Sequence, residues 1–180
     1  MPPTTAPEYQ YDFANVEQYL HHRPPYLMVD GIEVLDSTSI TTIKHVTGEE
    51  FFFPGHFPGA PVFPGAMLQE VATQSAGILI AARHNPMSEY ETSDPLFNEY
   101  ALGVLVRVRA SKFRGFVRPG DTIRAQVELI DRLNQQFEFR ARLTVGDRMV
   151  MRQEFQLANI RSEVLQGVAG VGAPVSEASE

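Results

Sequence analysis

The sequence predicts an α+β protein in which one long antiparallel sheet wraps around a single buried central helix. Residues 65–82 are the only long helix candidate, and their apolar side chains surround the helix axis instead of forming one stripe, as is typical of a buried helix. Between residues 122 and 157, apolar and polar side chains alternate with period two, which indicates antiparallel strands with one buried face. A sheet curled around the helix is the simplest packing of these parts.

The N-terminal part predicts one short helix. Residues 1–14 are rich in Pro and Thr, and we expect them to form a flexible lead-in. Asn15 is a candidate N-cap for a helix over residues 16–22. Pro24 and Pro25 would end that helix, because proline lacks the N–H group that a helix interior requires.

Two strands and a loop are predicted before the long helix. Residues 26–35 and 39–47 are rich in β-branched and other apolar side chains and are interpreted as strands, with a turn at residues 36–37. Residues 53–64 are dense in proline and glycine and predict a loop that leads directly into the helix.

The C-terminal half predicts the rest of the sheet. Its expected strands cover residues 100–117, 122–129, 137–145 and 149–157. The polar and acidic residues 84–98 are interpreted as a loop between the helix and the first of these strands. Residues 161–180 are expected to be a disordered tail, so that one domain covers residues 15–160.

The composition excludes several classes of protein. With 43% hydrophobic residues in 180, the chain can bury a core, and wholesale disorder is excluded. It has no cysteine, which rules out disulfides, thiolate catalysis and cysteine-based zinc sites. The net charge of −7 argues against non-specific binding of nucleic acid. No targeting or membrane-spanning segment is recognised, and we expect a soluble, cytoplasmic protein without membrane insertion.

One acidic residue on the apolar helix carries the chemical hypothesis. Glu70 lies among Leu68, Val71 and Ala72, where an ionised carboxylate needs a partner or a shifted pKa. His56 stands fourteen residues earlier, within the rigid sequence Gly-His-Phe-Pro. A histidine and a partly desolvated carboxylate form a natural pair for moving protons near neutral pH.

The start of the helix adds an anion-binding element. Pro64 and Gly65 open the helix, and the free N–H groups of its first turn would stabilise a developing negative oxygen. An acid, a base and an oxyanion site in one loop–helix unit indicate proton abstraction next to a carbonyl group.

Each of these features also has a purely structural interpretation. A loop histidine is most often structural, which is how we interpret the histidines outside the Gly-His-Phe-Pro sequence; these are His21, His22, His45 and His84. Glu70 alone could pair with an arginine, and Gly65 could serve packing. Their joint spacing favours function. No metal site is predicted, because the sequence lacks an HExxH motif and His21–His22 lack the geometry of metal ligands.

The run FFFPGHFPGAPVFPGAMLQEVATQ (residues 51–74) closely resembles the signature of the β-hydroxyacyl-acyl carrier protein dehydratases of bacterial fatty-acid synthesis. The similarity extends to HHRPPYLMVD (21–30) and KFRGFVRPGD (112–121), so that it covers roughly residues 16–160 in order. The resemblance implies a hotdog fold with a homodimer as the minimal unit, often assembled into a trimer of dimers.

The resemblance also implies an activity and the role of each site residue. The activity is the removal of water from a (3R)-hydroxyacyl thioester to give the trans-2-enoyl thioester, without a metal or organic cofactor. His56 resembles the base that takes the α-proton, and Glu70 of the other subunit the group that assists departure of the hydroxyl. The Gly65 N–H resembles the donor to the thioester carbonyl, and Gln74 the residue that holds the acid.

The expected partner is the acidic acyl carrier protein, whose phosphopantetheine arm carries the substrate. Lys112, Arg114 and Arg118 are the candidate docking residues, and strand alternation predicts that Arg107 and Arg109 lie on the opposite face. A solvated strand face explains these charges nearly as well.

Some positions depart from the family pattern, and other functions remain open. Gln69 stands where the family usually has an apolar residue, and the loop over residues 84–98 is longer than typical. The alternatives are a hotdog acyl thioesterase, a non-catalytic acyl-binding subunit, and a dehydratase of a polyketide-type pathway. His56 argues against hydrolysis, and the buried charge of Glu70 argues against a pure binder.

Overall fold

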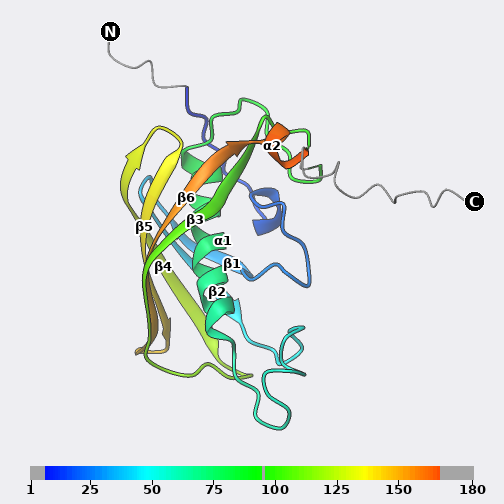
Figure 1. Cartoon of the computed structure of the whole chain (residues 1–180), viewed down its shortest axis with the longest axis vertical. Coiled ribbons are helices and arrows are strands. Elements are labelled where there is room, and N and C mark those ends of the chain that lie inside the picture. The colour runs from blue at the N-terminus through cyan, green and yellow to red at the C-terminus, as the bar shows by residue number, and fades with distance from the viewer. Residues whose placement is uncertain (1–6, 95, 167–180) are drawn as a thin grey trace, which may run out of the picture.

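The structure of the protein is a computed structural model that describes residues 7–94 and 96–166 (Figure 1). Six strands and one long helix make up most of it. In chain order the elements are η1 (Val16–Gln18), β1 (Gly31–Leu35), β2 (Ser39–His45), α1 (Gly65–Arg83), β3 (Tyr100–Phe113), β4 (Thr122–Leu133), β5 (Gln136–Val145), β6 (Arg148–Arg161) and α2 (Ser162–Gln166).

The strands form a single sheet with the order β1-β2-β4-β5-β6-β3, and every neighbouring pair is antiparallel. The sheet curls around α1, which runs along its concave face (Figure 1). The expected architecture is therefore confirmed. The order leaves two edges, the five-residue β1 and the fourteen-residue β3.

Helix α1 is buried along most of its length. Every residue from 71 to 82 is buried, including the polar Thr73, Gln74 and Ser75. The hydroxyls of Thr73 and Ser75 find partners inside the core, because an unpaired buried polar group is costly. Thr73 Oγ1 donates to the Gln69 carbonyl at 3.0 Å, and Ser75 Oγ donates to the Val71 carbonyl at 2.6 Å.

Two glycines allow α1 to pack closely against β3. Gly103 of β3 has φ +68°, and a Cβ atom there would lie 3.0 Å from the Cα of Gly77 on α1. Real Cβ atoms do not approach so closely without displacing the neighbour. This contact holds the middle of α1 against the strand at the sheet edge.

The predicted helix over residues 16–22 is shorter than expected. Only Val16–Gln18 is helical, as a single 3-10 turn. Tyr19 then turns into the core, where its hydroxyl accepts a hydrogen bond from Phe13 N–H at 2.6 Å. Together with the nearby Pro24, this inward turn leaves no room for another helical turn.

The strand predicted over residues 26–35 begins only at Gly31. Upstream, the backbone pairs with a side chain of α1 instead of with a strand. Gln74 Oε1 accepts from Met28 N–H at 2.7 Å, and Gln74 Nε2 donates to the Tyr26 carbonyl at 2.9 Å. These side-chain bonds replace a sheet ladder over this segment.

The expected faces of the basic residues on β3 are wrong. Arg107 pairs with Gln156. Lys112 pairs with Arg152, which lies on the same face of β6 as Gln156. The register shift between Arg107 and Lys112 inserts one residue and reverses the alternation. Both cations therefore lie on the same face of the sheet.

Parts of the expected terminal segments pack on the domain. In the lead-in, Tyr9 forms an isolated bridge with Asn85, and Tyr11 N–H donates to the Ala82 carbonyl at 2.9 Å. The expected tail begins with the short helix α2, and residues 1–6 and 167–180 lie outside the described part.

The Gly77–Gly103 contact generates the first prediction. We expect Gly103→Ala to lower the free energy of unfolding by about 2–5 kcal/mol, because it adds left-handed backbone strain and a clash with α1. Gly146→Ala is the control: Gly146 also has positive φ, +55°, but open space around it. We expect this control substitution to lower the free energy of unfolding by about 1–2 kcal/mol. Urea unfolding of both variants measures the difference, and equal losses would contradict the close contact.

Candidate active site

The loop before α1 fixes His56 in one orientation. His56 Nδ1 lies 2.8 Å from the Val62 carbonyl oxygen, and Val62 N–H in turn donates to the His56 carbonyl at 3.0 Å. A carbonyl can only accept a hydrogen bond, so Nδ1 carries the proton. In the neutral ring, Nε2 then has a free lone pair, which is the state that a general base requires.

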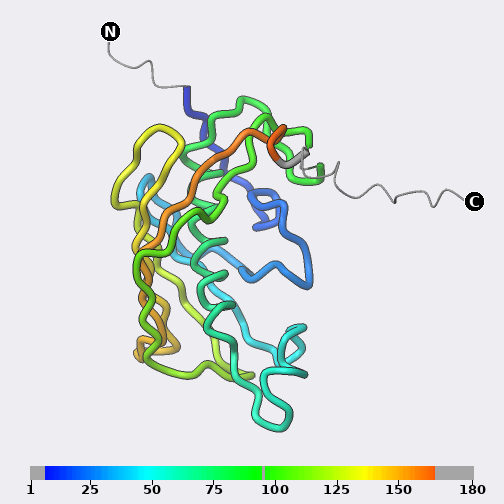
Figure 2. The backbone as a smooth tube through the Cα atoms, viewed as in Figure 1, coloured from blue at the N-terminus to red at the C-terminus, as the bar shows by residue number. Residues whose placement is uncertain are grey.

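His56 lines a cavity of about 430 Å³ at the start of α1. Its walls are largely apolar and come from the loop, from the first turns of α1 and from the end of β3. The lining residues include Phe57, Val62, Leu68, Phe113 and Phe116. Figure 2 shows how the loop before α1 projects beyond the sheet at this end of the molecule. The cavity can take an apolar substrate next to the imidazole.

Gly65 lines the same cavity and is the first residue of α1. Its N–H group has no backbone partner among the described residues, as expected at a helix N-terminus. A Cβ atom here would lie 3.0 Å from the ring of Phe113, so a larger residue would require that ring to shift. The structure thus brings His56 and Gly65 together, as the sequence predicts.

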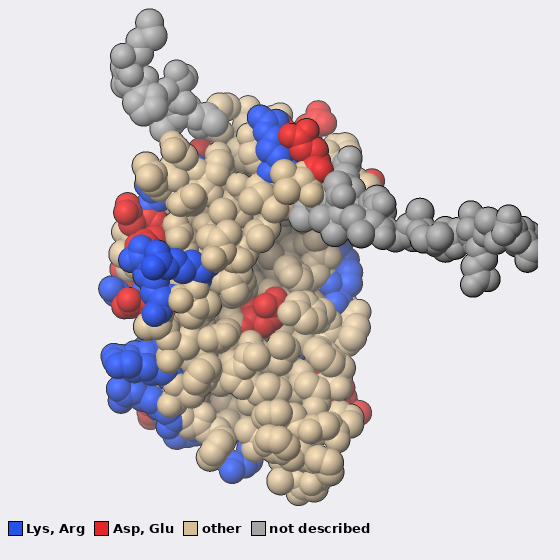
Figure 3. Space-filling view, in the orientation of Figure 1, with Lys and Arg blue, Asp and Glu red and all other residues tan. Residues whose placement is uncertain are grey.

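Glu70 lies one turn further along α1, and its side chain is 17% exposed. Gln74 Nε2 donates to Glu70 Oε1 at 2.8 Å, and His22 Nε2 lies 3.8 Å from the same oxygen. Figure 3 shows acidic side chains in a hollow near the middle of this face, with uncharged residues around them. The predicted pairing of Gln74 with the acid is present in the structure.

Gln74 has the contacts needed to hold this carboxylate in place. Its side chain is 1% exposed, and its amide bonds to Tyr26, Met28 and Glu70 at once. The two backbone partners fix which end of the amide carries the donor, because Met28 N–H donates and the Tyr26 carbonyl accepts. The NH₂ group must therefore face Glu70.

The surroundings of Glu70 shift the pKa of two neighbouring residues, His22 and Tyr26. Burial lowers the pKa of His22, while the charge of Glu70 opposes that shift. Burial raises the pKa of Tyr26, and the charge of Glu70 and a hydrogen bond to it raise that pKa further. His22 Nδ1 is buried without a hydrogen-bond partner among the described residues. Perturbed groups of this kind cluster at functional sites.

Within one chain the two halves of the site do not meet. Glu70 does not line the cavity of His56, and no hydrogen bond or ion pair joins the two side chains in the described structure. The geometry of α1 explains this: five residues from Gly65 to Glu70 rise about 7.5 Å and turn about 140° around the axis. One copy therefore presents the histidine and the acid in different directions.

The three candidate docking cations lie in different places. Arg114 lines the His56 cavity, and Arg118 lies 5.5 Å from the ring of Phe116. Lys112 lies on the face of the sheet away from α1, next to Arg152, which in turn pairs with Arg142. This row of three cations, Lys112–Arg152–Arg142, is called the basic row below.

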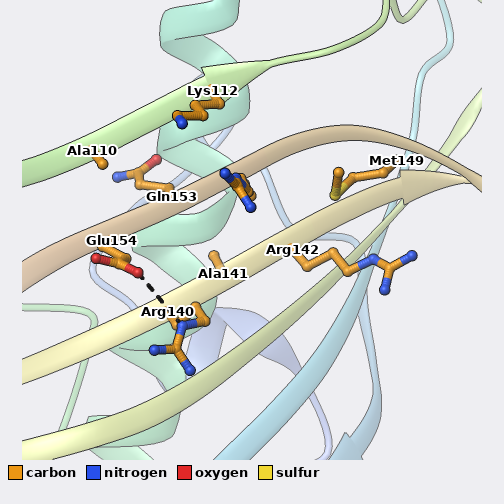
Figure 4. Close-up of a pocket in the computed structure, with 9 residues that line it drawn as sticks. Ala110, Lys112, Arg140, Ala141, Arg142, Met149, Gln153 and Glu154 are labelled. Carbon is orange, nitrogen blue, oxygen red and sulfur yellow. Dashed lines mark ion pairs between the residues drawn. The ribbon is translucent and has the colours of Figure 1, made fainter.

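The basic row lines a groove of about 470 Å³ (Figure 4). Beside it, Arg140 pairs with Glu154 at 3.7 Å, but no ion pair involves the basic row in the described part of the chain. Like charges on directly opposite strand residues destabilise a sheet. Arg142 and Arg152 cannot be recognised from the sequence as neighbours of Lys112, because only strand register brings the three residues together.

The surroundings of the acid differ from what the sequence predicts. His22 is expected to be structural and Tyr26 to lie in a strand, yet His22 lies beside Glu70 and Tyr26 stacks on His22, with ring centroids 5.9 Å apart. The run HHRPPY held a signal, because two prolines and three aromatic or imidazole rings in six residues are unusual for a strand.

Comparison with known proteins identifies relatives over most of the chain. The sequence model of the FabA-like domain matches residues 20–154. The chain is 32% identical over 153 residues to a 3-hydroxyacyl-[acyl-carrier-protein] dehydratase FabZ of Thiobacillus denitrificans, covering 84% of this chain and 99% of that protein.

Solved structures at low identity share the fold. The dehydratase heterocomplex ApeI:P from Xenorhabdus doucetiae matches with a TM-score of 0.70 at 14% identity, covering 87% of this chain and 99% of that chain. The fluoroacetyl-CoA thioesterase FlK matches with a TM-score of 0.58 at 16% identity, covering 81% of this chain and 100% of that chain. Structural likeness alone therefore does not separate dehydratases from thioesterases.

The buried amide of Gln74 generates the second prediction. We expect Gln74→Leu to lower the free energy of unfolding by about 2–4 kcal/mol, because the Met28 N–H and the Tyr26 carbonyl lose their partner. Gln69→Leu is the matched control on the same helix, where only a bond to the Ser111 hydroxyl is lost. Chemical denaturation compares the two, and an equal or smaller loss for Gln74→Leu would contradict the role of this amide.

Proposed function

The chain belongs to the FabA-like dehydratase family, and from this premise we propose that it removes water from (3R)-hydroxyacyl thioesters on acyl carrier protein to give trans-2-enoyl thioesters. It is a hydro-lyase of fatty-acid biosynthesis with the hotdog fold. The hydrogen bond from His56 Nδ1 to the Val62 carbonyl carries the mechanistic proposal, because it leaves Nε2 as a base.

His56 and Glu70 divide the two proton movements between them. His56 Nε2 takes the proton from the α-carbon, and the electron pair of that C–H bond forms the new double bond. The bond between the β-carbon and its hydroxyl breaks, and the acid form of Glu70 supplies the proton that makes the leaving group water. A proton passed from the imidazolium to the carboxylate then restores both groups.

The start of α1 stabilises the charge that develops during proton removal. As the α-proton leaves, negative charge moves onto the thioester carbonyl oxygen. The Gly65 N–H has no backbone partner in the described part of the chain, Gly65 lines the cavity of His56, and the positive end of the α1 dipole lies behind this N–H. We assign it as the donor to that oxygen. Gln74 acts as a positioning residue, since it reaches the reaction only through Glu70.

A homodimer supplies the missing half of the site. The orientations of His56 and Glu70 in one chain support a site in which Glu70 comes from the partner subunit. β3 is a long sheet edge with exposed apolar side chains, including Leu105, Val106 and Val108, and such an edge invites pairing with a second copy. The trimer of dimers implied by the family resemblance stays a prediction.

The reaction needs no cofactor in this proposal. Both bond changes are proton transfers coupled to movement of an electron pair, and side-chain acids and bases can supply each. Among the described residues, no helix has the length and apolar content to cross a membrane. We propose the cytoplasm as the compartment, in keeping with a chain free of cysteine.

We propose the basic row as the docking site of the acidic carrier. Its three cations lie side by side without acidic partners in the described structure, on a chain whose net charge is −7. The row starts at Lys112, next to Phe113, which lines the cavity of His56. A carrier bound there would hold its thioester arm close to the site. Arg114, on the cavity wall, would meet the arm itself.

The competing functions differ in what they require of His56. A thioesterase with this fold would release a free thiol and would have no need of a fixed imidazole base. A non-catalytic acyl-binding subunit would gain nothing from a half-buried carboxylate. A polyketide-type dehydratase would use the same pair on another acyl chain. Incubation with a 3-hydroxyacyl thioester separates these functions. Enoyl absorbance indicates dehydration, release of a free thiol indicates a thioesterase, and a non-catalytic subunit gives neither signal.

Removal of either proton-transfer group tests the assignment. We expect His56→Ala and Glu70→Gln each to lower kcat by about 10²–10⁴-fold, while the protein remains a folded oligomer. Formation of the enoyl thioester gives the rate, and circular dichroism with light scattering gives the control. Wild-type turnover by either folded variant would remove that residue from the mechanism.

Mixing these two inactive variants tests whether the site is shared. After joint refolding, about half of the dimers are mixed, and each mixed dimer holds one intact and one doubly changed site if the subunits exchange Glu70. We expect about a quarter of the wild-type activity to return. If both residues served the site within their own chain, the mixture would stay inactive.

Charge reversal tests carrier docking. We expect Lys112→Glu to raise KM for carrier-bound substrate several-fold and to leave KM for a small thioester analogue unchanged, because only the carrier contacts the basic row. The difference should shrink at high salt. Arg124→Glu is the control, since Arg124 is paired with Glu33 and lies outside the basic row. Equal effects on both substrates would argue against docking at this row.

A further inference from the structure

A small apolar pocket lies further along α1, beyond Glu70. Its volume is about 180 Å³, which is too small for a whole drug-sized ligand but sufficient for the end of an alkyl chain. Leu20, Gly77, Ala101, Leu102 and two tyrosine rings make up most of its wall. Nothing in the mechanism above uses this pocket.

The pocket follows directly from the acid along one face of the helix. Glu70, Gln74 and Gly77 are spaced by four and three residues, so they lie on the same face of α1. His22 lines the pocket and also lies 3.8 Å from Glu70. A substrate whose β-carbon faces Glu70 would therefore have its alkyl tail directed to this pocket.

A segment of the long loop after α1 forms part of the pocket wall. We call residues 87–94 the strap, and its Tyr90 lines the pocket. The Tyr90 hydroxyl donates to the Tyr19 carbonyl at 2.6 Å, and Tyr11 Oη donates to the Met87 carbonyl at 2.8 Å. In Figure 2 this green segment and the blue N-terminal segment lie at the same end of the molecule.

His21 joins the strap to the N-terminal segment through hydrogen bonds that require one neutral tautomer of its ring. Asn98 Oδ1 accepts from Glu91 N–H, so its NH₂ group must face His21 Nε2, 3.0 Å away. Nε2 therefore accepts, and Nδ1 carries the proton that it donates to the Thr92 carbonyl at 3.1 Å. Both ring nitrogens are satisfied only in this neutral tautomer.

Arg23 adds a second connection at the same point. Its guanidinium donates to the Thr92 carbonyl at 3.0 Å and to the Leu20 carbonyl at 2.7 Å. The Thr92 hydroxyl donates in turn to the Glu17 carbonyl at 2.5 Å. The strap is thus tied to the N-terminal segment on both sides of Tyr90, which is more than a loose surface loop requires.

From this arrangement we propose that the strap closes the far end of the acyl pocket, with Tyr90 as the residue that sets the longest alkyl chain the enzyme accepts. The proposal rests on the dehydratase function above. Two further contacts keep the ring in place: Tyr90 lies 5.9 Å from Tyr11 and 6.1 Å from His21, measured between ring centroids. A longer chain would have to displace this network.

Opposite changes to the pocket test the proposal. The assay compares kcat/KM for 3-hydroxyacyl thioesters from four to sixteen carbons. We expect Tyr90→Ala to raise kcat/KM for chains beyond the wild-type limit by about tenfold, the lower end of the effect of one methylene group in an apolar pocket, and to change kcat/KM for short chains little. Ala101→Leu fills the pocket and should shorten the longest alkyl chain that the enzyme accepts. An unchanged length profile in both variants would overturn the proposal.

Controls separate the strap from general damage and from the function itself. Tyr9→Ala makes the same chemical change near the loop, where Tyr9 bridges to Asn85 outside the pocket, and should keep the wild-type profile. Asn98→Leu removes the hydrogen-bond donor to His21 and, like Tyr90→Ala, should allow the enzyme to accept longer alkyl chains. If the wild-type enzyme has no dehydratase activity with any acyl chain length, the proposed function is refuted. If it is active but the variants keep the same dependence of kcat/KM on chain length, only the proposed role of the strap is refuted.

Discussion

The burial of α1 is the constraint on which the rest of the structure depends. A helix enclosed by a sheet must satisfy every polar atom that it carries inside, and Gln74 does so by bonding to the backbone of residues 26–28. The same amide has one N–H left for Glu70. The interaction that holds the N-terminal segment against the helix therefore also orients the carboxylate.

This constraint also separates His56 from Glu70 within one chain. The His56 loop and the Gly65 N–H lie at the start of α1, and the carboxylate projects from another side of the helix one turn later. Because α1 is buried along most of its length, the direction of Glu70 is set by its position on the helix. In the dimer that we propose, a second copy across the β3 edge provides the acid without any rearrangement of the helix.

The fold and the pairings within α1 could be predicted from the sequence, whereas the relations between strands could not. Apolar side chains all around residues 65–82 predict the buried helix, and the family resemblance implies that Gln74 holds Glu70. The face of the sheet on which Lys112 lies depends on a bulge in β3 that the residue types do not predict. The basic row depends on the register between neighbouring strands. The role of residues 26–28 was missed because their hydrogen bonds go to a side chain of α1, which period-two patterns do not reveal.

The most direct test of the central claim is a crystal structure of the Glu70→Gln dimer with a bound 3-hydroxyacyl thioester. The account predicts His56 Nε2 of one subunit against the α-carbon and residue 70 of its partner against the β-hydroxyl of the same ligand. The alkyl tail should point along α1 toward Gly77. A ligand that touches His56 but lies remote from residue 70 of both chains would contradict the shared site.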